Sequence, residues 1–201
     1  MKSKTVIINL AGGPCVGKST VAAGVFFELK KRGISCELVR EVAKDTVWED
    51  TTSLLENQIH IFSEQFRRQW MVIDKVQFVI TDSPLILNSV YLDEFVEKQG
   101  RYTTFDPEYL EQMRNFFDET FMQFNNMDFV ISREFTDEDG QIVYRPYTEN
   151  GRLQKQEDAI KLDKKIADKI YKFNPGSITL FGDEDKNVKT ILGHLMTRHK
   201  L

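Results

Sequence analysis

Residues 5–20 have the sequence TVIINLAGGPCVGKST, and this stretch decides how the rest of the chain is interpreted. The apolar, β-branched run at 5–10 is typical of a strand that is buried on both faces of a sheet. Residues 12–19 fit the G-x-x-x-x-G-K-[ST] pattern of a phosphate-binding loop. Residues 18–31 have the periodicity of an amphipathic helix, and Gly33 stands where that helix should stop. A strand, a glycine loop and a helix in this order predict a site for nucleotide phosphates.

The residues of this loop have separate expected roles. The glycines let the backbone curl so that its N–H groups face phosphate oxygens, and the helix start adds its positive end. Lys18 is expected to reach the β- and γ-phosphates, and the Ser19 hydroxyl to bind Mg²⁺. We interpret Cys15 as a small loop residue rather than a nucleophile. The predicted ATP-binding set is Gly12, Gly13, Pro14, Cys15, Val16, Gly17, Lys18, Ser19 and Thr20.

The order of the remaining elements predicts the fold. Further strands are expected at 34–39, 77–81, 127–132 and 177–181. Helices are expected at 55–73, 84–99, 106–124, 159–173 and 184–199. Strands that alternate with helices give right-handed crossovers and a parallel sheet. We therefore predict one domain over residues 1–201, with the α/β three-layer P-loop NTPase fold and a five-stranded parallel sheet.

Composition excludes several classes of protein. The chain has 27 basic and 31 acidic residues and a formal charge of −4, which argues mildly against broad binding to nucleic acid. Its apolar runs are far shorter than the roughly 20 residues that span a membrane. Two cysteines without a C-x-x-C motif, and no signal-peptide pattern, predict a reduced cytoplasmic protein.

Two carboxylates follow predicted strands and are candidates for the chemistry. Asp82 would lie beside the phosphate loop if its strand neighbours the first one. There it could hold metal-bound water or accept the proton of an attacking hydroxyl, and it could also cap the next helix. Glu41 follows the second strand, where it could bind the acceptor or act as base; a surface ion pair is the alternative. Both are predicted to be catalytic and substrate-binding, and Asp82 to bind the metal.

Arginines supply the remaining candidates. Arg67 could bind an anionic group of the substrate. Residues 133–153 combine turn signals with three arginines and are interpreted as a lid insert, with a solvated hairpin as the alternative. Of these arginines, Arg145 and Arg152 are the catalytic candidates that would stabilise the transferring phosphoryl group. Residues 84–126 are expected to enclose the acceptor.

Several blocks together carry a family resemblance. INLAGGPCVGKST, VREVAKD, LENQIHIFSEQFRRQ, VITDSP and ENGRLQ…AIKLDKKI follow the order seen in P-loop ATPase/kinases similar to the nicotinamide riboside kinase domain. Deoxynucleoside and thymidylate kinases are the wider relatives, and the resemblance covers nearly the whole chain. It implies that residues 12–20 bind ATP and Mg²⁺, that Glu41 and Asp82 lie on the acceptor and metal side, and that Arg145 or Arg152 lies in the lid. Many phage proteins look like this group, which implies a phage source.

The sequence departs from the nucleoside kinase pattern after the third strand. Those kinases often have Asp-Arg-Ser or Glu-Arg-Ser there, whereas this chain has Asp82-Ser83-Pro84. The expected function is ATP- and Mg²⁺-dependent transfer of the γ-phosphoryl group to a hydroxyl of a nucleoside, nucleotide or related small metabolite. A kinase acting on polynucleotide ends or DNA-base hydroxyls is the second hypothesis, and a non-enzymatic ATP-binding module is the third.

Overall fold

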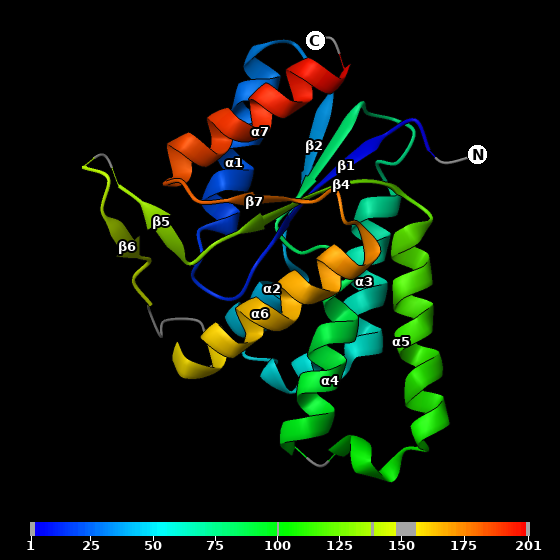
Figure 1. Cartoon of the computed structure of the whole chain (residues 1–201). Helices are drawn as coiled ribbons and strands as arrows, with labels where there is room; N and C mark the ends of the chain where they lie inside the picture. The colour runs from blue at the N-terminus through cyan, green and yellow to red at the C-terminus, as the bar shows by residue number, and fades with distance from the viewer. Residues whose placement is uncertain (1–2, 100, 138, 148–155, 200–201) are drawn as a thin grey trace.

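A five-stranded parallel sheet forms the centre of the protein. The structure is a computed structural model and describes residues 3–99, 101–137, 139–147 and 156–199. The strands lie in the order β2-β3-β1-β4-β7, and every neighbouring pair is parallel (Figure 1). Their bounds are β1 Val6–Ala11, β2 Cys36–Val39, β3 Phe78–Thr81, β4 Asn125–Ile131 and β7 Ile178–Leu180. The predicted five-stranded parallel sheet is confirmed.

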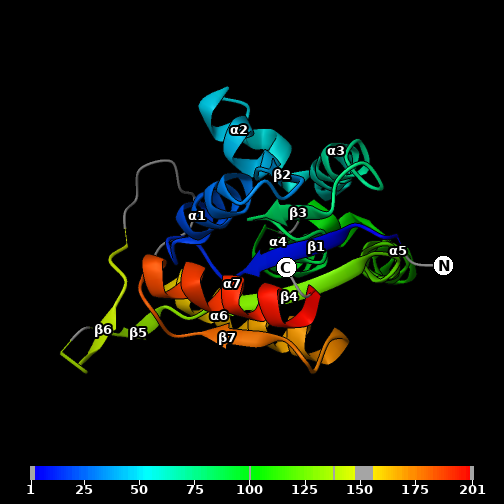
Figure 2. The ribbon, with the colours of Figure 1, turned by 90° about the horizontal axis from the view of Figure 1, so that it is seen from above.

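Helices cover both faces of the sheet and make the three layers. One face packs against α1 (Lys18–Lys31) and α7 (Glu184–His199). The other face packs against α3 (Gln58–Trp70), α4 (Leu87–Gln99), α5 (Pro107–Met122) and α6 (Gln156–Phe173) (Figure 2). Strand β1 is buried along its whole length because it lies between these two hydrophobic cores. Its carboxyl end carries the phosphate loop.

The region after β2 differs from the prediction. The structure has a short helix α2 (Val42–Trp48), where no helix was expected. It also has a 3₁₀ helix η1 (Thr52–Glu56), where the long helix was expected to begin. Helix α3 begins only at Gln58, because the Asn57 side chain accepts a hydrogen bond from the His60 N–H and caps it there. The segment from α2 to α3 therefore folds as separate short elements at the edge of the sheet.

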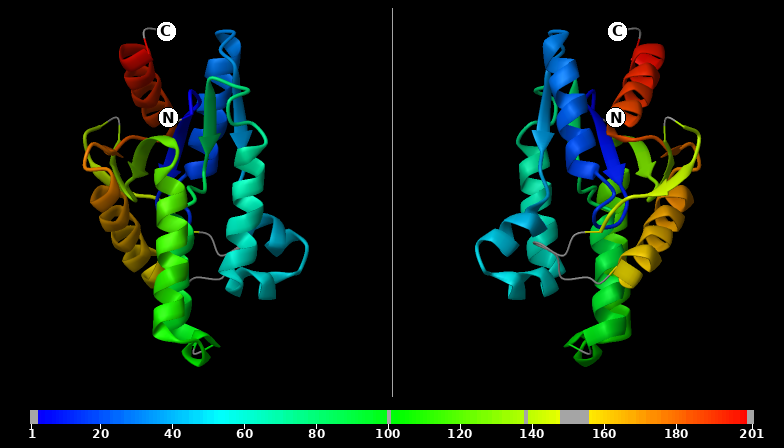
Figure 3. Two further views of the ribbon diagram at one scale, coloured as in Figure 1. Left: turned by 90° about the vertical axis from the view of Figure 1, so that its right-hand side faces the viewer. Right: turned by 90° about the vertical axis from the view of Figure 1, so that its left-hand side faces the viewer.

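The segment expected to be a lid contains an antiparallel hairpin. Strands β5 (Glu134–Thr136) and β6 (Ile142–Tyr144) pair, and the hairpin projects from the molecule on the side opposite α5 (Figures 1 and 3). At its root the Arg145 N–H donates to the carbonyl of Arg133 over 3.0 Å. Arg152, another candidate from this segment, lies outside the described residues.

Two other elements complete the description. A short 3₁₀ helix η2 (Arg101–Thr104) joins α4 to α5. Helix α5 begins where predicted, because the Asp106 side chain accepts from the Glu108 N–H and Pro107 occupies the first turn. Across the described part of the chain, no helix is both long and apolar enough to cross a membrane.

Candidate functional site

The phosphate loop has a backbone that its two outer glycines permit. Gly12 has φ 146° and Gly17 has φ 84°, and side chains rarely tolerate either conformation. Gly17 is also the N-cap of α1, so the loop leads directly into the positive end of that helix. Val16 anchors the loop, because its side chain is fully buried in the hydrophobic core. The chain thus presents a curved backbone and a helix start at the carboxyl end of β1.

Lys18 places a positive charge where the loop meets a cleft. Its Nζ donates to the Gly13 carbonyl over 2.8 Å, so the side chain folds back across the loop. Ser19 and Thr20, in the first turn of α1, are both exposed on the surface. An ammonium group and two hydroxyl-bearing side chains therefore lie together where the loop passes into α1.

An ion pair flanks the first half of the loop. The Asp163 carboxylate of α6 accepts from the Gly13 N–H over 2.8 Å and from Arg133 Nε over 2.6 Å. Arg133 Nη2 donates in turn to the Pro14 carbonyl over 2.8 Å. Arg133 was predicted only as one of the three arginines of the expected lid, and Asp163 was not predicted. The available signal is weak: Asp163 is an acidic residue beside the apolar stripe of the helix that follows the hairpin.

A second ion pair flanks the other half of the loop. The Arg145 guanidinium is only 5% exposed, and it binds the Glu184 carboxylate and the Gly182 carbonyl. It also lies over the Phe135 ring, 4.9 Å from the centroid. A Cβ atom on Gly17 would lie 2.7 Å from Glu184 Oε1 and 3.2 Å from Arg145 Nη1. Arg145 therefore adjoins the loop as expected, but as a fixed side chain rather than a free one.

Asp82 lies beside the loop strand. Strand β3 neighbours β1, which meets the condition that the sequence analysis set for this residue. The Asp82 carboxylate is 4% exposed and accepts the Glu41 N–H over 2.9 Å. Among the described residues, no hydrogen bond joins it to the first turn of α4, so the capping role finds no support there. The two predicted carboxylate residues are thus neighbours at one edge of the sheet.

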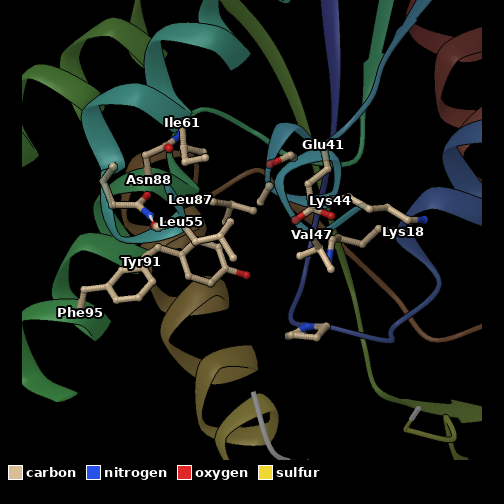
Figure 4. A pocket seen from close by; sticks show the side chains of 14 residues that line it. Lys18, Glu41, Lys44, Val47, Leu55, Ile61, Leu87, Asn88, Tyr91 and Phe95 are labelled. Atoms are coloured by element: carbon tan, nitrogen blue, oxygen red, sulfur yellow. Dashed lines mark hydrogen bonds between the residues drawn. The ribbon is translucent and has the colours of Figure 1, made fainter. Parts of the chain in front are cut away.

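A cleft opens directly from the phosphate loop between α2, α3 and α4 (Figure 4). It encloses about 750 Å³, part of which is open solvent. Lys18, Glu41 and Lys44 lie at one end, and Tyr91 and Phe95 lie at the other. The remaining lining side chains are mostly apolar: Pro14, Ala43, Val47, Leu55, Ile61 and Leu87, with Gln58, Ser83 and Asn88. The cleft therefore joins charged groups near the loop to an apolar, aromatic end.

Gln58 adds a fixed polar group to the wall of this cleft. It is 4% exposed, and its Nε2 donates to the Leu55 carbonyl over 2.7 Å. That bond leaves Oε1 buried without a hydrogen-bond partner among the described residues. A buried acceptor without a partner is unfavourable in the folded state. The sequence analysis missed Gln58 because it interpreted this segment only as an amphipathic helix.

Arg67 does not belong to this cleft. Its exposed guanidinium forms an ion pair with Glu64 of the same helix, over 2.7 Å. The hydrogen bond from Arg67 is the largest cause that lowers the pKa of Glu64 to about 2. The adjacent Arg68 binds Asp45 over 2.7 Å. The expectation that Arg67 binds substrate is therefore corrected: it lies on the outer face of α3, because the apolar stripe faces the core.

The donor groups near the loop fit Mg²⁺ in their chemistry. Mg²⁺ is usually bound by one or two protein oxygens together with phosphate oxygens and water. The Ser19 hydroxyl and the Asp82 carboxylate are oxygen donors of this kind, from α1 and from the end of β3. Within the described residues, no cluster of three or more His, Cys, Asp or Glu residues forms an all-protein metal site. Such a site suits an ion that arrives with a nucleotide.

Comparison with known proteins gives matches to solved structures. No protein-family profile matches the sequence, and no curated protein matches it. The deoxyadenosine kinase from M. mycoides with bound dATP matches with a TM-score of 0.58 and 16% identity, over 94% of this chain and 98% of that one. The same kinase with bound dCTP matches with a TM-score of 0.55 and 17% identity, over 96% and 99% of the two chains.

A second kind of match is the NadR protein in complex with NR. It has a TM-score of 0.63 and 14% identity, over 95% of this chain and 51% of that one. At these identities the likeness concerns the fold alone. The matches extend over 94% and 95% of this chain, so they concern the whole α/β architecture. This chain therefore has the fold of the P-loop nucleoside kinases.

Proposed function

We propose that the protein is an ATP- and Mg²⁺-dependent kinase that transfers the γ-phosphoryl group to a hydroxyl of a nucleoside or a related small metabolite. The observation that carries this proposal is the cleft that opens from the loop at Lys18 and Pro14. A cleft at this place would give a second substrate direct access to the transferred phosphate. The proposal divides into a donor side, an acceptor side and a transfer step.

On the donor side, residues 12–20 bind the phosphates of ATP. The loop N–H groups and the start of α1 attract phosphate oxygens, and Lys18 adds a full positive charge. Ser19 and Asp82 hold the Mg²⁺, which when bound neutralises charge on the β- and γ-phosphates. The Lys18 ammonium has three N–H donors, so it can keep its bond to the Gly13 carbonyl and still donate to phosphate oxygens.

On the acceptor side, the cleft suits a molecule with a polar end and a flat apolar end. Glu41 lies near Lys18, where a sugar-like hydroxyl would have to be presented. Tyr91 and Phe95 lie at the far end, where they could contact the face of a ring. Gln58 and Asn88 are polar side chains in the cleft wall that could recognise polar groups of the acceptor. The similar structures are a deoxyadenosine kinase and NadR in complex with NR, and a nucleoside has this general form.

In the transfer step, the acceptor hydroxyl oxygen forms a bond to the γ-phosphorus. The bond between that phosphorus and the β–γ bridging oxygen breaks, and ADP leaves. The hydroxyl proton passes to a carboxylate, for which Asp82 and Glu41 are the candidates. Arg145, beside Gly17, supplies positive charge near the phosphates during this step. Arg152 remains a candidate for the same role from the sequence pattern alone.

The charge of the acceptor-side segment favours a small acceptor over DNA. Residues 84–126 contain eight acidic and three basic residues, which would repel a polynucleotide rather than attract it.

We also propose one domain over residues 1–201, in which residues 133–153 act as a lid. The exposed Ile142 and Tyr144 of the hairpin support the lid, because few contacts hold its tip. A cytoplasmic location and a phage source are proposed from the sequence alone.

A transfer screen tests the proposed function. ATP labelled at the γ-phosphate is incubated with Mg²⁺ and single acceptors: nucleosides, nucleotides, nicotinamide riboside and a DNA duplex. The proposal predicts label on a nucleoside or a related small molecule, and none with the Lys18→Ala variant. Label on the DNA duplex alone would support the DNA kinase hypothesis instead. ATP binding without transfer to any acceptor would support a binding module.

A further inference from the structure

Tyr102 links two distant segments of the chain through its hydroxyl group. The residue lies in η2, which follows α4 in the chain, and it is only 8% exposed. Its hydroxyl donates a hydrogen bond to the carbonyl of Glu56, at the end of η1. The same oxygen accepts the N–H of Gln58, the first residue of α3, over 3.4 Å. One hydroxyl therefore connects η2 to the junction between η1 and α3.

This junction depends on side chains for its geometry. The first N–H groups of a helix have no partner within the helix, so other groups must accept from them. The Asn57 side chain accepts the His60 N–H over 3.1 Å, and Tyr102 accepts the Gln58 N–H. Burial raises the pKa of the Tyr102 hydroxyl above its ordinary value, so the hydroxyl stays protonated and keeps donating to Glu56. Asn57 thus fixes the junction locally, and Tyr102 fixes it to the hydrophobic core to which its own ring belongs.

The junction supplies part of one wall of the acceptor cleft. Leu55 of η1 and Gln58 of α3 both line the cleft, and a hydrogen bond of 2.7 Å from Gln58 Nε2 to the Leu55 carbonyl joins them. Another wall is α4, which contributes Tyr91 and Phe95 (Figure 4). Tyr102 itself is not among the residues that line this cleft. Because Tyr102 follows α4 and binds the η1–α3 junction, its hydroxyl connects the two walls.

We infer that Tyr102 is a positioning residue for the acceptor, whose hydroxyl sets the separation between the η1–α3 junction and α4 and thereby the width of the cleft. The inference rests on the proposed function, because it assumes an acceptor in this cleft. A ring held between apolar walls loses a quarter to a half of its dispersion attraction when a gap of roughly 0.5–1 Å opens. The phosphate loop lies at the other end of the cleft from Tyr91 and Phe95, so donor binding should not depend on Tyr102.

Steady-state kinetics of Tyr102→Phe test this role, because the variant loses only the hydroxyl. The acceptor is the one that the wild type phosphorylates best in the transfer screen. We expect KM for the acceptor to rise about three- to tenfold, with KM for ATP and kcat each changed by less than about twofold, as for the loss of one hydrogen bond away from the reacting groups.

Tyr171→Phe is the matched control for this variant. It removes a tyrosine hydroxyl that forms a part-buried hydrogen bond with Thr179, between α6 and β7. Neither residue is among those that line the acceptor cleft. The variant should therefore leave the two KM values and kcat unchanged, although it also loses a buried hydrogen bond.

A second variant tests the same junction from its other side. Asn57→Ala removes the side-chain cap of α3 and should raise KM for the acceptor in the same selective way. It replaces Tyr102→Phe where thermal melting shows that variant to be unfolded. An unchanged KM for the acceptor, or a joint rise of both KM values that Tyr171→Phe reproduces, would overturn the inference while the proposed function stands. Transfer to no acceptor by the wild type would refute the proposed function, and the inference with it.

Discussion

Replacing Gly13 by alanine tests the contact between the phosphate loop and α6. Gly13 does not have a positive φ, so alanine fits its backbone and only the surrounding space decides the outcome. The new Cβ would lie 2.3 Å from Asp163 Oδ1 and 3.0 Å from the Ala159 carbonyl oxygen. The second neighbour is helix backbone, which cannot rotate away. We therefore expect the loop to move and its hydrogen bond to Asp163 to break.

The expected loss combines two effects. Overpacking in a tight interior costs about 1–3 kcal/mol, and a hydrogen bond to a charged group contributes about 1.5–3 kcal/mol. Because part of the bond's worth is recovered by water, we expect a total near 3 kcal/mol. For a chain of this size, that lowers the melting temperature by about 6–12 °C. Thermal unfolding followed by circular dichroism measures the shift.

Two further variants make this prediction specific. Gly193→Ala in α7 has open space around its Cβ, and it should leave stability unchanged or raise it by up to about 1 kcal/mol. Asp163→Ala removes one of the two atoms that Gly13→Ala would meet, so the double variant should lose less than the sum of the single losses. A melting temperature for Gly13→Ala within about 2 °C of the wild type, or strictly additive losses, would refute the described contact.

Three other predictions follow from the site and the core. Asp82→Asn should lower kcat by about 10² or more with little change in ATP affinity, whereas equal kcat values in steady-state assays would exclude a role in proton transfer. Arg145→Ala should weaken the binding of ADP and of ATP alike. Adding Glu184→Gln to that variant should partly restore both affinities in calorimetry, because it removes the carboxylate left beside Gly17. Burial, and to a smaller extent the charge of Arg198, lowers the pKa of His199 in the folded state. Below about pH 6.5 the unfolded state therefore binds more protons than the folded state, and the free energy of unfolding falls there. His199→Gln should reduce this fall in urea unfolding at pH 7.5 and 5.5.

Much of the fold follows from local sequence patterns. Helices α1 and α7 begin and end at the predicted residues, because periodic apolar positions mark both, and Gly33 follows the end of α1. The five strands of the parallel sheet were located to within one or two residues, since buried strands are short continuous apolar runs. Helix α2 was missed because only two of its seven residues are buried, which leaves almost no periodic signal.

The candidate site was predictable only where its residues are close in sequence. The loop from Gly12 to Thr20 is a contiguous motif, and Asp82 follows from the end of a strand. Asp163 and Glu184 contact the same loop from 150 and 167 residues away, and a helical pattern shows which face is buried but not what it contacts. For the same reason, the pattern did not show that Arg67 pairs within its own helix.

Phosphorus NMR of a reaction mixture tests the central claim most directly. Enzyme, ATP, Mg²⁺ and a nucleoside accepted in the transfer screen are followed until ATP is consumed. We predict that the γ-phosphate signal disappears while a phosphomonoester signal of equal intensity grows, with ADP formed in the same amount. Growth of inorganic phosphate in place of the phosphomonoester would show transfer to water and would contradict the assignment of the cleft as an acceptor site.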